Sequence, residues 1–196
     1  MDDDWKAVWQ PVIDAVGTDF ADDAEVWGAD EVEKGFIRRF LEPLEFDCPL
    51  HYDKTVAEQY GYSDILAPYS SLMSQALPPL WRPGRRVWTS AERNAQPAYS
   101  PVAAPNNEAT QKIMPNAPGF FATDIEIDYL QPVVVGDRIR TQGRKLLSCM
   151  PKETSVGRGA FLVWESEILN QREELVARTR IGVYLYDPHV SKVTQE

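Results

Sequence analysis

The feature that most constrains the fold is a change of hydrophobic period near residue 120. Beyond this point Ile125, Ile127 and Tyr129 alternate with acidic residues. Alternation at period two is typical of a strand with one buried face and one wet face. The same kind of pattern returns over residues 133–147, 159–169 and 175–186. The second half of the chain is therefore predicted to consist of strands joined by hairpins.

The first half of the chain has helical periodicity instead. Helices are predicted over residues 4–16, 33–44, 54–60 and 70–81. Asp53 is placed to cap the third helix, and Pro78 with Pro79 should break the fourth one early. The fourth is also the most apolar, so it belongs inside the protein with a sheet as its cover. Helices followed by hairpin-linked strands indicate an antiparallel sheet in an α+β domain.

The composition is that of a globular protein and excludes several function classes. Hydrophobic residues make up 43% of the 196 residues, and six Trp and eight Tyr argue against disorder. A net charge of -10 argues against nucleic-acid binding, because phosphate contacts need a basic face. Cys48 and Cys149 are too few for a disulfide framework or a zinc motif, and no metal is expected. With no secretory signal and no apolar run of about 18 residues, a soluble, cytoplasmic protein without membrane contact is expected.

Two parts of different character are expected along the chain. Residues 1–30 form a helical arm followed by an acidic linker, and residues 31–196 form one domain. The arm packs on its own domain or covers a partner subunit, and the sequence leaves both open. Residues 82–119 contain six prolines and little periodicity, so they are predicted to be a long irregular loop. The arginines at its start are ordinary surface residues or a phosphate-binding cluster: Arg82, Arg85, Arg86 and Arg93.

One short loop contains residues suited to proton transfer. Asp47 and His51 lie directly before the third predicted helix, and His51 is one of only two histidines. An imidazole can take or give a proton near neutral pH, which suits chemistry beside a carbonyl. On the residues alone, the sequence favours a loop histidine bonded to backbone, and it leaves open whether Asp47 is a turn or capping residue instead of a catalyst. Ser70 and Ser71 lack the glycine-flanked turn of a nucleophilic serine, which argues against a serine hydrolase.

Several short motifs, taken in their order and spacing, resemble one known family. They are Phe36-Ile37-Arg38-Arg39-Phe40, Pro49-Leu50-His51-Tyr52-Asp53 followed by Ala57 and Gly61-Tyr62, Leu66-Ala67-Pro68, and Tyr129-Leu130-Gln131-Pro132-Val133-Val134-Val135-Gly136-Asp137-Arg138. Over roughly residues 31–187 the chain resembles the MaoC-like dehydratases. The likeness is to the N-terminal half of the fatty-acid-synthase-type dehydratase group within the hot-dog superfamily.

The resemblance implies a fold and an activity. The fold is a hot dog, in which a curved antiparallel sheet wraps around the helix of residues 70–81, here with an extra N-terminal helix. Family members hydrate 2-enoyl thioesters or dehydrate 3-hydroxyacyl thioesters of coenzyme A or carrier protein, without a cofactor. The implied function is an enoyl-CoA hydratase or 3-hydroxyacyl-CoA dehydratase subunit in fatty-acid, steroid side-chain or polyketide-like metabolism. A second hot-dog subunit, the same or different, is the implied partner, so that two units form a double hot dog.

The resemblance also assigns roles to residues. His51 is the implied base, and Tyr69 is the implied backbone N–H donor to the thioester oxygen, because Pro68 has no N–H. The expected substrate-binding residues are Ser70, beside this donor, and Arg82, Arg85 and Arg86, because arginine matches the geometry of phosphate. The family's aspartate lies five residues before its histidine, where this chain has Phe46. Asp47 lies four before it, so it is the implied catalytic carboxylate only if the loop is rebuilt.

Two explanations of this departure are open. Cys48 replaces the family's asparagine and Glu45 its glycine. Either the rebuilt loop lets Asp47 or Glu45 do the carboxylate's work, or the subunit kept the histidine and lost its carboxylate partner. In the second case the chain is a non-catalytic hot dog that binds the acyl chain and stabilises a catalytic partner. A hot-dog thioesterase is disfavoured, because that activity requires a carboxylate on the central helix and residues 70–81 contain none.

Overall fold

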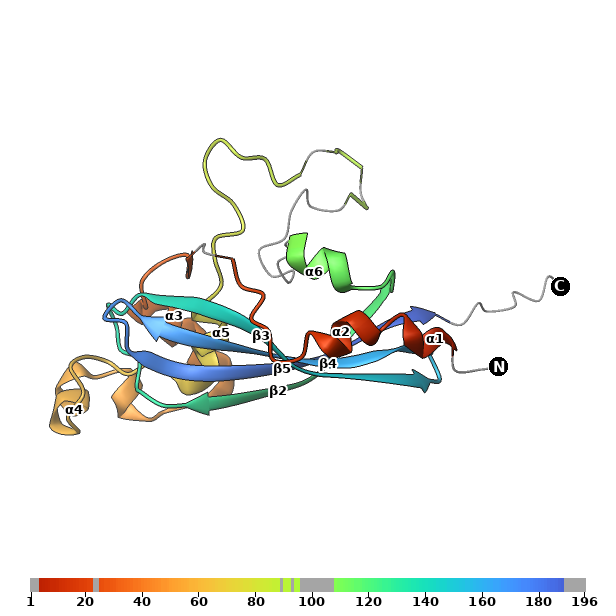
Figure 1. The fold of residues 1–196 in the computed structure, drawn as a ribbon. Coiled ribbons are helices and arrows are strands. Elements are labelled where there is room, and N and C mark those ends of the chain that lie inside the picture. Colours follow the sequence, from red (N-terminus) through yellow and green to blue (C-terminus); the bar gives the residue numbers. More distant parts are fainter. Residues whose placement is uncertain (1–3, 23–24, 89, 93, 96–107, 189–196) are drawn as a thin grey trace.

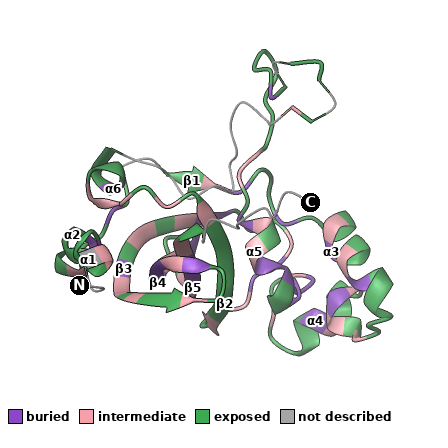
Figure 2. Cartoon of the chain, turned by 90° about the vertical axis from the view of Figure 1, so that its right-hand side faces the viewer, coloured by how far each residue is buried: buried purple, intermediate pink, exposed green. Residues whose placement is uncertain are grey.

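The computed structural model describes residues 4–22, 25–88, 90–92, 94–95 and 108–188. They form a five-stranded, antiparallel sheet in the strand order β1-β3-β4-β5-β2 (Figure 1). The strands are β1 (Val26–Trp27), β2 (Gly119–Tyr129), β3 (Ile139–Thr154), β4 (Gly157–Asn170) and β5 (Leu175–Pro188). The sheet is strongly curved (Figure 2). The predicted α+β class with an antiparallel sheet is therefore confirmed.

Short helices lie at both ends of the long strands. They are α1 (Asp4–Ala7), α2 (Gln10–Asp14), α3 (Lys34–Leu41), α4 (Lys54–Gln59), α5 (Leu72–Gln75) and α6 (Glu108–Ile113), with 3₁₀ turns η1 (Glu42–Leu44), η2 (Pro49–His51) and η3 (Tyr69–Ser71). In Figure 1, α3, α4 and α5 lie at one end, and α1, α2 and α6 at the other. Within the described part of the chain, no helix has the length and apolar character needed to cross a membrane.

Two apolar clusters form the core, one toward each end of the strands. The first packs Ile37 of α3 and Leu72 of α5 against Ile168 of β4. The second packs Trp9, in the N-terminal arm, against Leu162 of β4. Because Ile168 and Leu162 are an even number of positions apart, both clusters lie on the same face of β4. The arm thus packs on its own sheet, which is one of the two arrangements that the sequence left open.

The N-terminal residues contribute more to the sheet than the sequence predicted. The single helix expected over residues 4–16 is divided into α1 and α2, because Pro11 lies in the first turn of α2 and suits a helix start. Val26–Trp27, within the expected linker, pairs with β3 as strand β1. Phe20, also in that segment, is buried with its ring centroid 5.8 Å from that of Trp164. The expected linker is therefore partly built into the core.

The apolar helix against the sheet is shorter than predicted. A helix was expected over residues 70–81, but the structure has η3 followed by α5, which ends at Gln75. A residue before proline is disfavoured in the helical conformation, so Leu77 and Pro78 stop the helix. Gly28 lies so close to its end that an added Cβ would stand 2.3 Å from the backbone oxygen of Gln75. The chain after β1 therefore packs directly on the end of α5.

The segment predicted to be an irregular loop, residues 82–119, is only partly irregular. It contains α6, and β2 begins at its last residue, Gly119. Residues 96–107 lie outside the described part of the chain. In Figure 1 the chain after α5 leads away from the sheet before it returns through α6 to β2.

Burial makes Cys149 a poor nucleophile. Its side chain packs against the second apolar cluster, and this burial raises the pKa of the thiol from its ordinary 9.0 to about 11. Because the thiolate is the reactive form, we expect iodoacetamide at pH 8 to alkylate Cys149 about 100-fold more slowly in the native protein than in urea. Mass spectrometry of a Cys48→Ser variant measures the rate, and equal rates in the two states would contradict the prediction.

Candidate functional site

The structure holds His51 in a buried and oriented position. The residue ends the turn η2 and is 8% exposed. Its ring atom Nδ1 lies 2.7 Å from the backbone oxygen of Leu66. A carbonyl oxygen only accepts hydrogen bonds, so Nδ1 carries the proton and donates it. In the neutral ring Nε2 is then the unprotonated nitrogen, which is the state that a general base requires.

The loop that carries His51 is fastened to the chain that leads into α5. Beside the imidazole contact, the N–H of Leu66 donates to the backbone oxygen of Leu50 at 3.0 Å. The next residue, Ala67, donates its N–H to the backbone oxygen of Val133 at 2.8 Å. The segment around Leu66 is therefore held on two sides, and it places the imidazole beside the entry to η3.

The helix behind this loop starts as the sequence predicted. Asp53 caps α4, because its Oδ1 accepts the N–H of Thr55 at 2.8 Å. Lys54 donates to Oδ2 of Asp64 at 2.6 Å, which ties α4 to the segment before Leu66. This hydrogen bond lowers the pKa of the Asp64 carboxyl and raises that of Lys54. Asp53 therefore serves the helix, as predicted, and α4 supports the loop from outside.

Phe46, where the resemblance leads one to expect an aspartate, lies against His51. The two ring centroids are 5.6 Å apart, and the backbone oxygen of Phe46 accepts the hydroxyl of Tyr52 at 2.7 Å. Asp47 and Glu45 are exposed, and within the described residues no hydrogen bond joins either of them to His51. The structure thus brings His51 together with an aromatic ring and leaves the two candidate carboxylates in solvent.

The predicted oxyanion donor is the first residue of η3. The leading N–H groups of a helical turn have no partner inside it, so Tyr69 has no acceptor within η3. The residue is 46% exposed, and its ring centroid lies 5.0 Å from that of Tyr129 on β2. Ser70 is exposed, whereas Ser71 is buried and donates its hydroxyl to the backbone oxygen of Pro68 at 2.8 Å. Tyr69 and Ser70 therefore share one exposed turn, and their roles stay predictions.

A small pocket lies beside this turn. It has room for about one water molecule and is lined by Ala67, Pro68, Tyr69, Ser71, Leu72, Gln75, Gln131 and Val133. The Nε2 atom of Gln75 is buried without a hydrogen-bond partner among the described residues. Such an orphan amide is costly unless a bound water or ligand satisfies it. Sequence reasoning missed Gln75 and Gln131; the only signal was a glutamine inside the most apolar helix. His51 is not among the lining residues.

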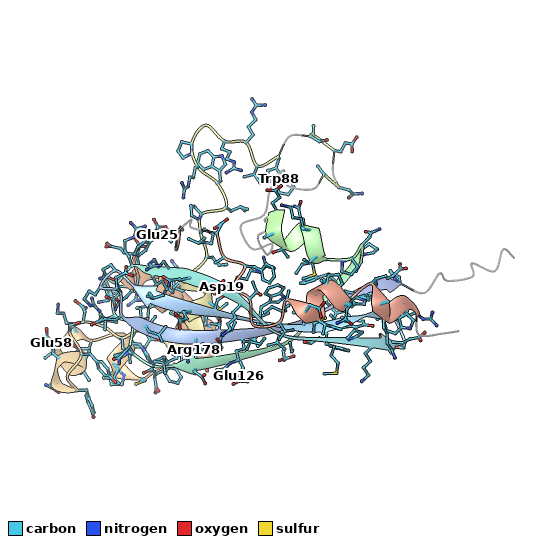
Figure 3. All side chains as sticks on the ribbon, viewed as in Figure 1. Asp19, Glu25, Glu58, Trp88, Glu126 and Arg178 are labelled. Carbon is cyan, nitrogen blue, oxygen red and sulfur yellow. The ribbon has the colours of Figure 1, made fainter. Side chains whose placement is uncertain are left out.

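The predicted substrate-binding arginines lie on the segment that leads away from the sheet, where Figure 3 labels Trp88. Arg85 donates its N–H to the backbone oxygen of Arg82 at 3.1 Å, closing a turn in which Gly84 has a φ of 84°. Arg82, Arg85 and Arg86 are exposed, and Arg93 lies outside the described residues. The structure therefore does not draw these arginines into the buried surroundings of His51.

The expected absence of a metal and of a cofactor stays a prediction. In the described ranges, no three or more His, Cys, Asp or Glu side chains are grouped so that they could hold a metal ion.

Comparisons with known proteins bear on this arrangement. The family described as FAS1-like, dehydratase domain region, matches residues 15–179. A probable enoyl-CoA hydratase alpha subunit from Thermomonospora curvata is 25% identical over 170 residues, which are 86% of this chain and 49% of that protein. The chain thus spans about half the length of this curated relative.

Two solved structures show the same fold at low sequence identity. A chain of the ChsH1-ChsH2 complex from Mycobacterium tuberculosis has a TM-score of 0.63 and 18% identity, covering 96% of both chains. The MaoC-like dehydratase from Rhodospirillum rubrum has a TM-score of 0.52 and 21% identity, covering 87% of this chain and 96% of that one. The predicted hot-dog fold is confirmed, and because the family match extends over most of its length, the chain belongs to the FAS1-like dehydratase domain region family of MaoC-like hot-dog dehydratases.

Proposed function

We propose that the chain is a subunit of an enoyl-CoA hydratase, which adds water to 2-enoyl thioesters and, in reverse, dehydrates 3-hydroxyacyl thioesters. The observation that carries the proposal is the 2.7 Å contact between Nδ1 of His51 and the backbone oxygen of Leu66. It fixes a buried imidazole with Nε2 as the free base. Membership of a dehydratase family and likeness to a probable enoyl-CoA hydratase alpha subunit support the proposal.

Hydration of an enoyl thioester needs a base, a donor for the oxyanion and a proton for Cα. In the proposal, Nε2 of His51 takes a proton from water while the water oxygen attacks the β-carbon and the C=C electrons move toward the thioester oxygen. The N–H of Tyr69 stabilises that charge, an effect of about 3 to 4 kcal/mol per donor. In the proposal, the imidazolium of His51 then gives the proton taken from water to the carboxylate of Asp47, which passes it to Cα, so that both parts of the water end on the product and both side chains return to their starting states. For this, Asp47 must turn from solvent toward the ring when substrate binds.

Substrate binding is proposed to use the exposed polar residues after the histidine loop. Ser70 shares its turn with Tyr69, which suits a contact with the thioester. The guanidinium groups of Arg82, Arg85 and Arg86 match the geometry of the phosphates on coenzyme A.

One contact favours a second interpretation. The ring of Phe46 stands at the position of the family's aspartate, with its centroid 5.6 Å from that of His51. A phenyl ring has no donor or acceptor with which to hold a water or give a proton. In this version the chain binds the acyl group and stabilises a catalytic partner, which supplies the reacting groups.

Both versions include a second hot-dog subunit. Among the described residues, β2 pairs on one side only, and Phe120, Ile125 and Tyr129 on it are 63%, 58% and 40% exposed. Exposed apolar side chains along an open sheet edge are typical of a surface that another chain covers. The ChsH1-ChsH2 structure is of a complex with two components, and we propose the same kind of pairing here.

The proposed activity is tested by following two products from 2-enoyl-CoA with the purified complex. Hydration removes the C=C bond and its ultraviolet absorbance but leaves the thioester intact, so no free thiol should form. A thiol reagent in a parallel sample detects any thioester hydrolysis. Release of coenzyme A thiol, or unchanged enoyl absorbance with the complex assembled, would contradict the proposal.

A further inference from the structure

The outer face of the sheet, opposite the apolar clusters, carries a ladder of alternating charges. Its members are Glu126 and Asp128 on β2, Arg178 and Arg180 on β5, and Glu165 and Glu167 on β4; Figure 3 labels Glu126 and Arg178. Arg180 lies 3.0 Å from Glu165 on one side. On its other side it lies 2.6 Å from Glu126 and 3.1 Å from Asp128. The charges therefore alternate from strand to strand across the sheet.

This ladder ends in unbalanced negative charge at β2. Four carboxylates share two guanidinium groups, and Lys145 of β3 lies opposite Glu165 on the same face, so one negative charge is left over among these residues. The surplus is outermost, because the side chains of Glu126 and Asp128 are 66% and 46% exposed while that of Glu165 is 21% exposed. Asp124, which pairs with Gly182, is the preceding residue of β2 on the same outer face, two positions before Glu126. Three carboxylates thus line the edge on its outer face.

The same strand is open along its length and incompletely covered on its inner face. β2 has 11 residues, whereas the opposite edge strand, β1, has two. Phe120 and Ile125 face the core side, opposite Leu185 and Ile181, but are 63% and 58% exposed. Charged residues at a sheet edge commonly protect against unwanted strand pairing. That protection does not explain the exposed apolar residues on the same strand, which are typical of a surface that another chain covers. β2 therefore fits a surface that another strand extends.

A second copy of this chain fits the edge poorly. Residues directly opposite each other in an antiparallel pair lie on the same face of the sheet. In a two-fold pair of β2 strands centred at Glu126, that residue opposes itself and Asp124 opposes Asp128. Like charges placed directly opposite are destabilising. A strand with basic residues at these positions would instead continue the alternation already present from β4 to β2.

We propose that β2 pairs with a different hot-dog chain, one whose edge strand carries Lys or Arg at alternate positions on its outer face. The acidic row of Asp124, Glu126 and Asp128 selects this partner and rejects a second copy of the chain. The inference rests on the proposed function for the existence of a second hot-dog subunit, and it adds the chemistry that identifies that subunit.

The test uses the chain itself as a probe, with a charge-reversed Asp124→Lys/Glu126→Lys/Asp128→Lys copy in the role of the basic partner, so that every acidic position of the row is reversed. Sedimentation velocity should show the wild-type chain and the reversed chain each monomeric alone, and a one-to-one pair in their mixture. The mixed pair should be at least about tenfold tighter than either self-pair. It should also weaken as salt is raised from 50 mM to 500 mM, about a threefold change in screening length.

Two further variants keep the test decisive. Arg180 loses two partners in the reversed chain, so the neutral variant Glu126→Gln/Asp128→Asn is measured beside it; without repulsion it should self-associate more tightly than wild type. A control with Asp14→Lys, Glu58→Lys and Glu108→Lys makes the same change of net charge on α2, α4 and α6 and should not pair with wild type. Wild-type self-association as tight as the mixed pair, or no association by either edge variant, would overturn the proposal.

The association test and the activity test can fail separately. If the charged edge selects its partner but the assembled complex leaves 2-enoyl-CoA unchanged, the proposed function fails and this inference stands. If the complex hydrates 2-enoyl-CoA and its affinity is unaffected by Glu126→Gln/Asp128→Asn, the inference fails and the function stands.

Discussion

Replacing His51 with alanine should lower the turnover of 2-enoyl-CoA by the assembled complex about 10²- to 10⁴-fold, the range that general acid–base assistance contributes. The reason is the fixed ring: Nδ1 is committed to the backbone oxygen of Leu66 at 2.7 Å, which leaves Nε2 to take the proton from water. Because the base acts on water and not on the acyl group, KM should change little while kcat falls. Initial rates over a range of substrate concentrations separate these two constants.

The control for this substitution is His189→Ala, which removes the other histidine of the chain. It should leave kcat unchanged. A His51→Ala complex that keeps full turnover would contradict the catalytic role and support the version in which the partner supplies the base. Asp47→Asn in the same assay should lower kcat about tenfold or more if its carboxyl serves Cα.

Replacing Asp137 with alanine should lower the stability of the fold by about 3 kcal/mol, because buried donors would lose their acceptor. Asp137 is 2% exposed, and its Oδ2 accepts the N–H of Val134 at 3.0 Å. Its Oδ1 accepts from Gln171 at 3.1 Å and from Arg172 at 2.9 Å. One carboxylate thus joins the turn before β3 to the hairpin between β4 and β5.

Thermal unfolding followed by circular dichroism checks this value. For a chain of this size, about 3 kcal/mol corresponds to a fall in Tm of about 6 to 12 °C. Asp187→Ala, at an exposed position near the end of β5, is the matched control and should stay within about 0.5 kcal/mol of wild type. If the Asp137→Ala variant had the same Tm as this control, the carboxylate would not stabilise the connection between the turn before β3 and the β4–β5 hairpin.

The sheet was predictable because its hydrophobic period depends on local sequence, but the limits of β3 were not. The sequence predicted a strand over residues 133–147, whereas β3 runs from Ile139 to Thr154. Residues 133–137 form a turn instead, closed by the buried carboxylate of Asp137. At the other end, β3 continues through Pro151. This proline is tolerated because β1 pairs with β3 no further than Thr141, so the missing N–H costs no ladder bond on that side.

The candidate site was predictable in its members but not in its contacts. The motif order placed His51 in a turn near the apolar helix, and it marked Phe46 as the departure from the family pattern. The hydrogen bond from the imidazole reaches a backbone oxygen 15 residues away, which only the folded chain brings into range. The orphan amide of Gln75 was likewise invisible, because its burial depends on how α5 packs beside Gln131 and Val133.

The most direct test of the central claim is the tautomer of His51 in the assembled complex. The chain is labelled with ¹⁵N-histidine, carries His189→Ala and is paired with unlabelled partner, so only one imidazole is observed in a long-range ¹H–¹⁵N correlation spectrum. We predict a neutral ring with its proton on Nδ1 and a bare Nε2 whose signal shifts when a non-reactive enoyl thioester analogue binds. A proton on Nε2, or an Nε2 signal whose chemical shift does not change when the analogue binds, would contradict the account.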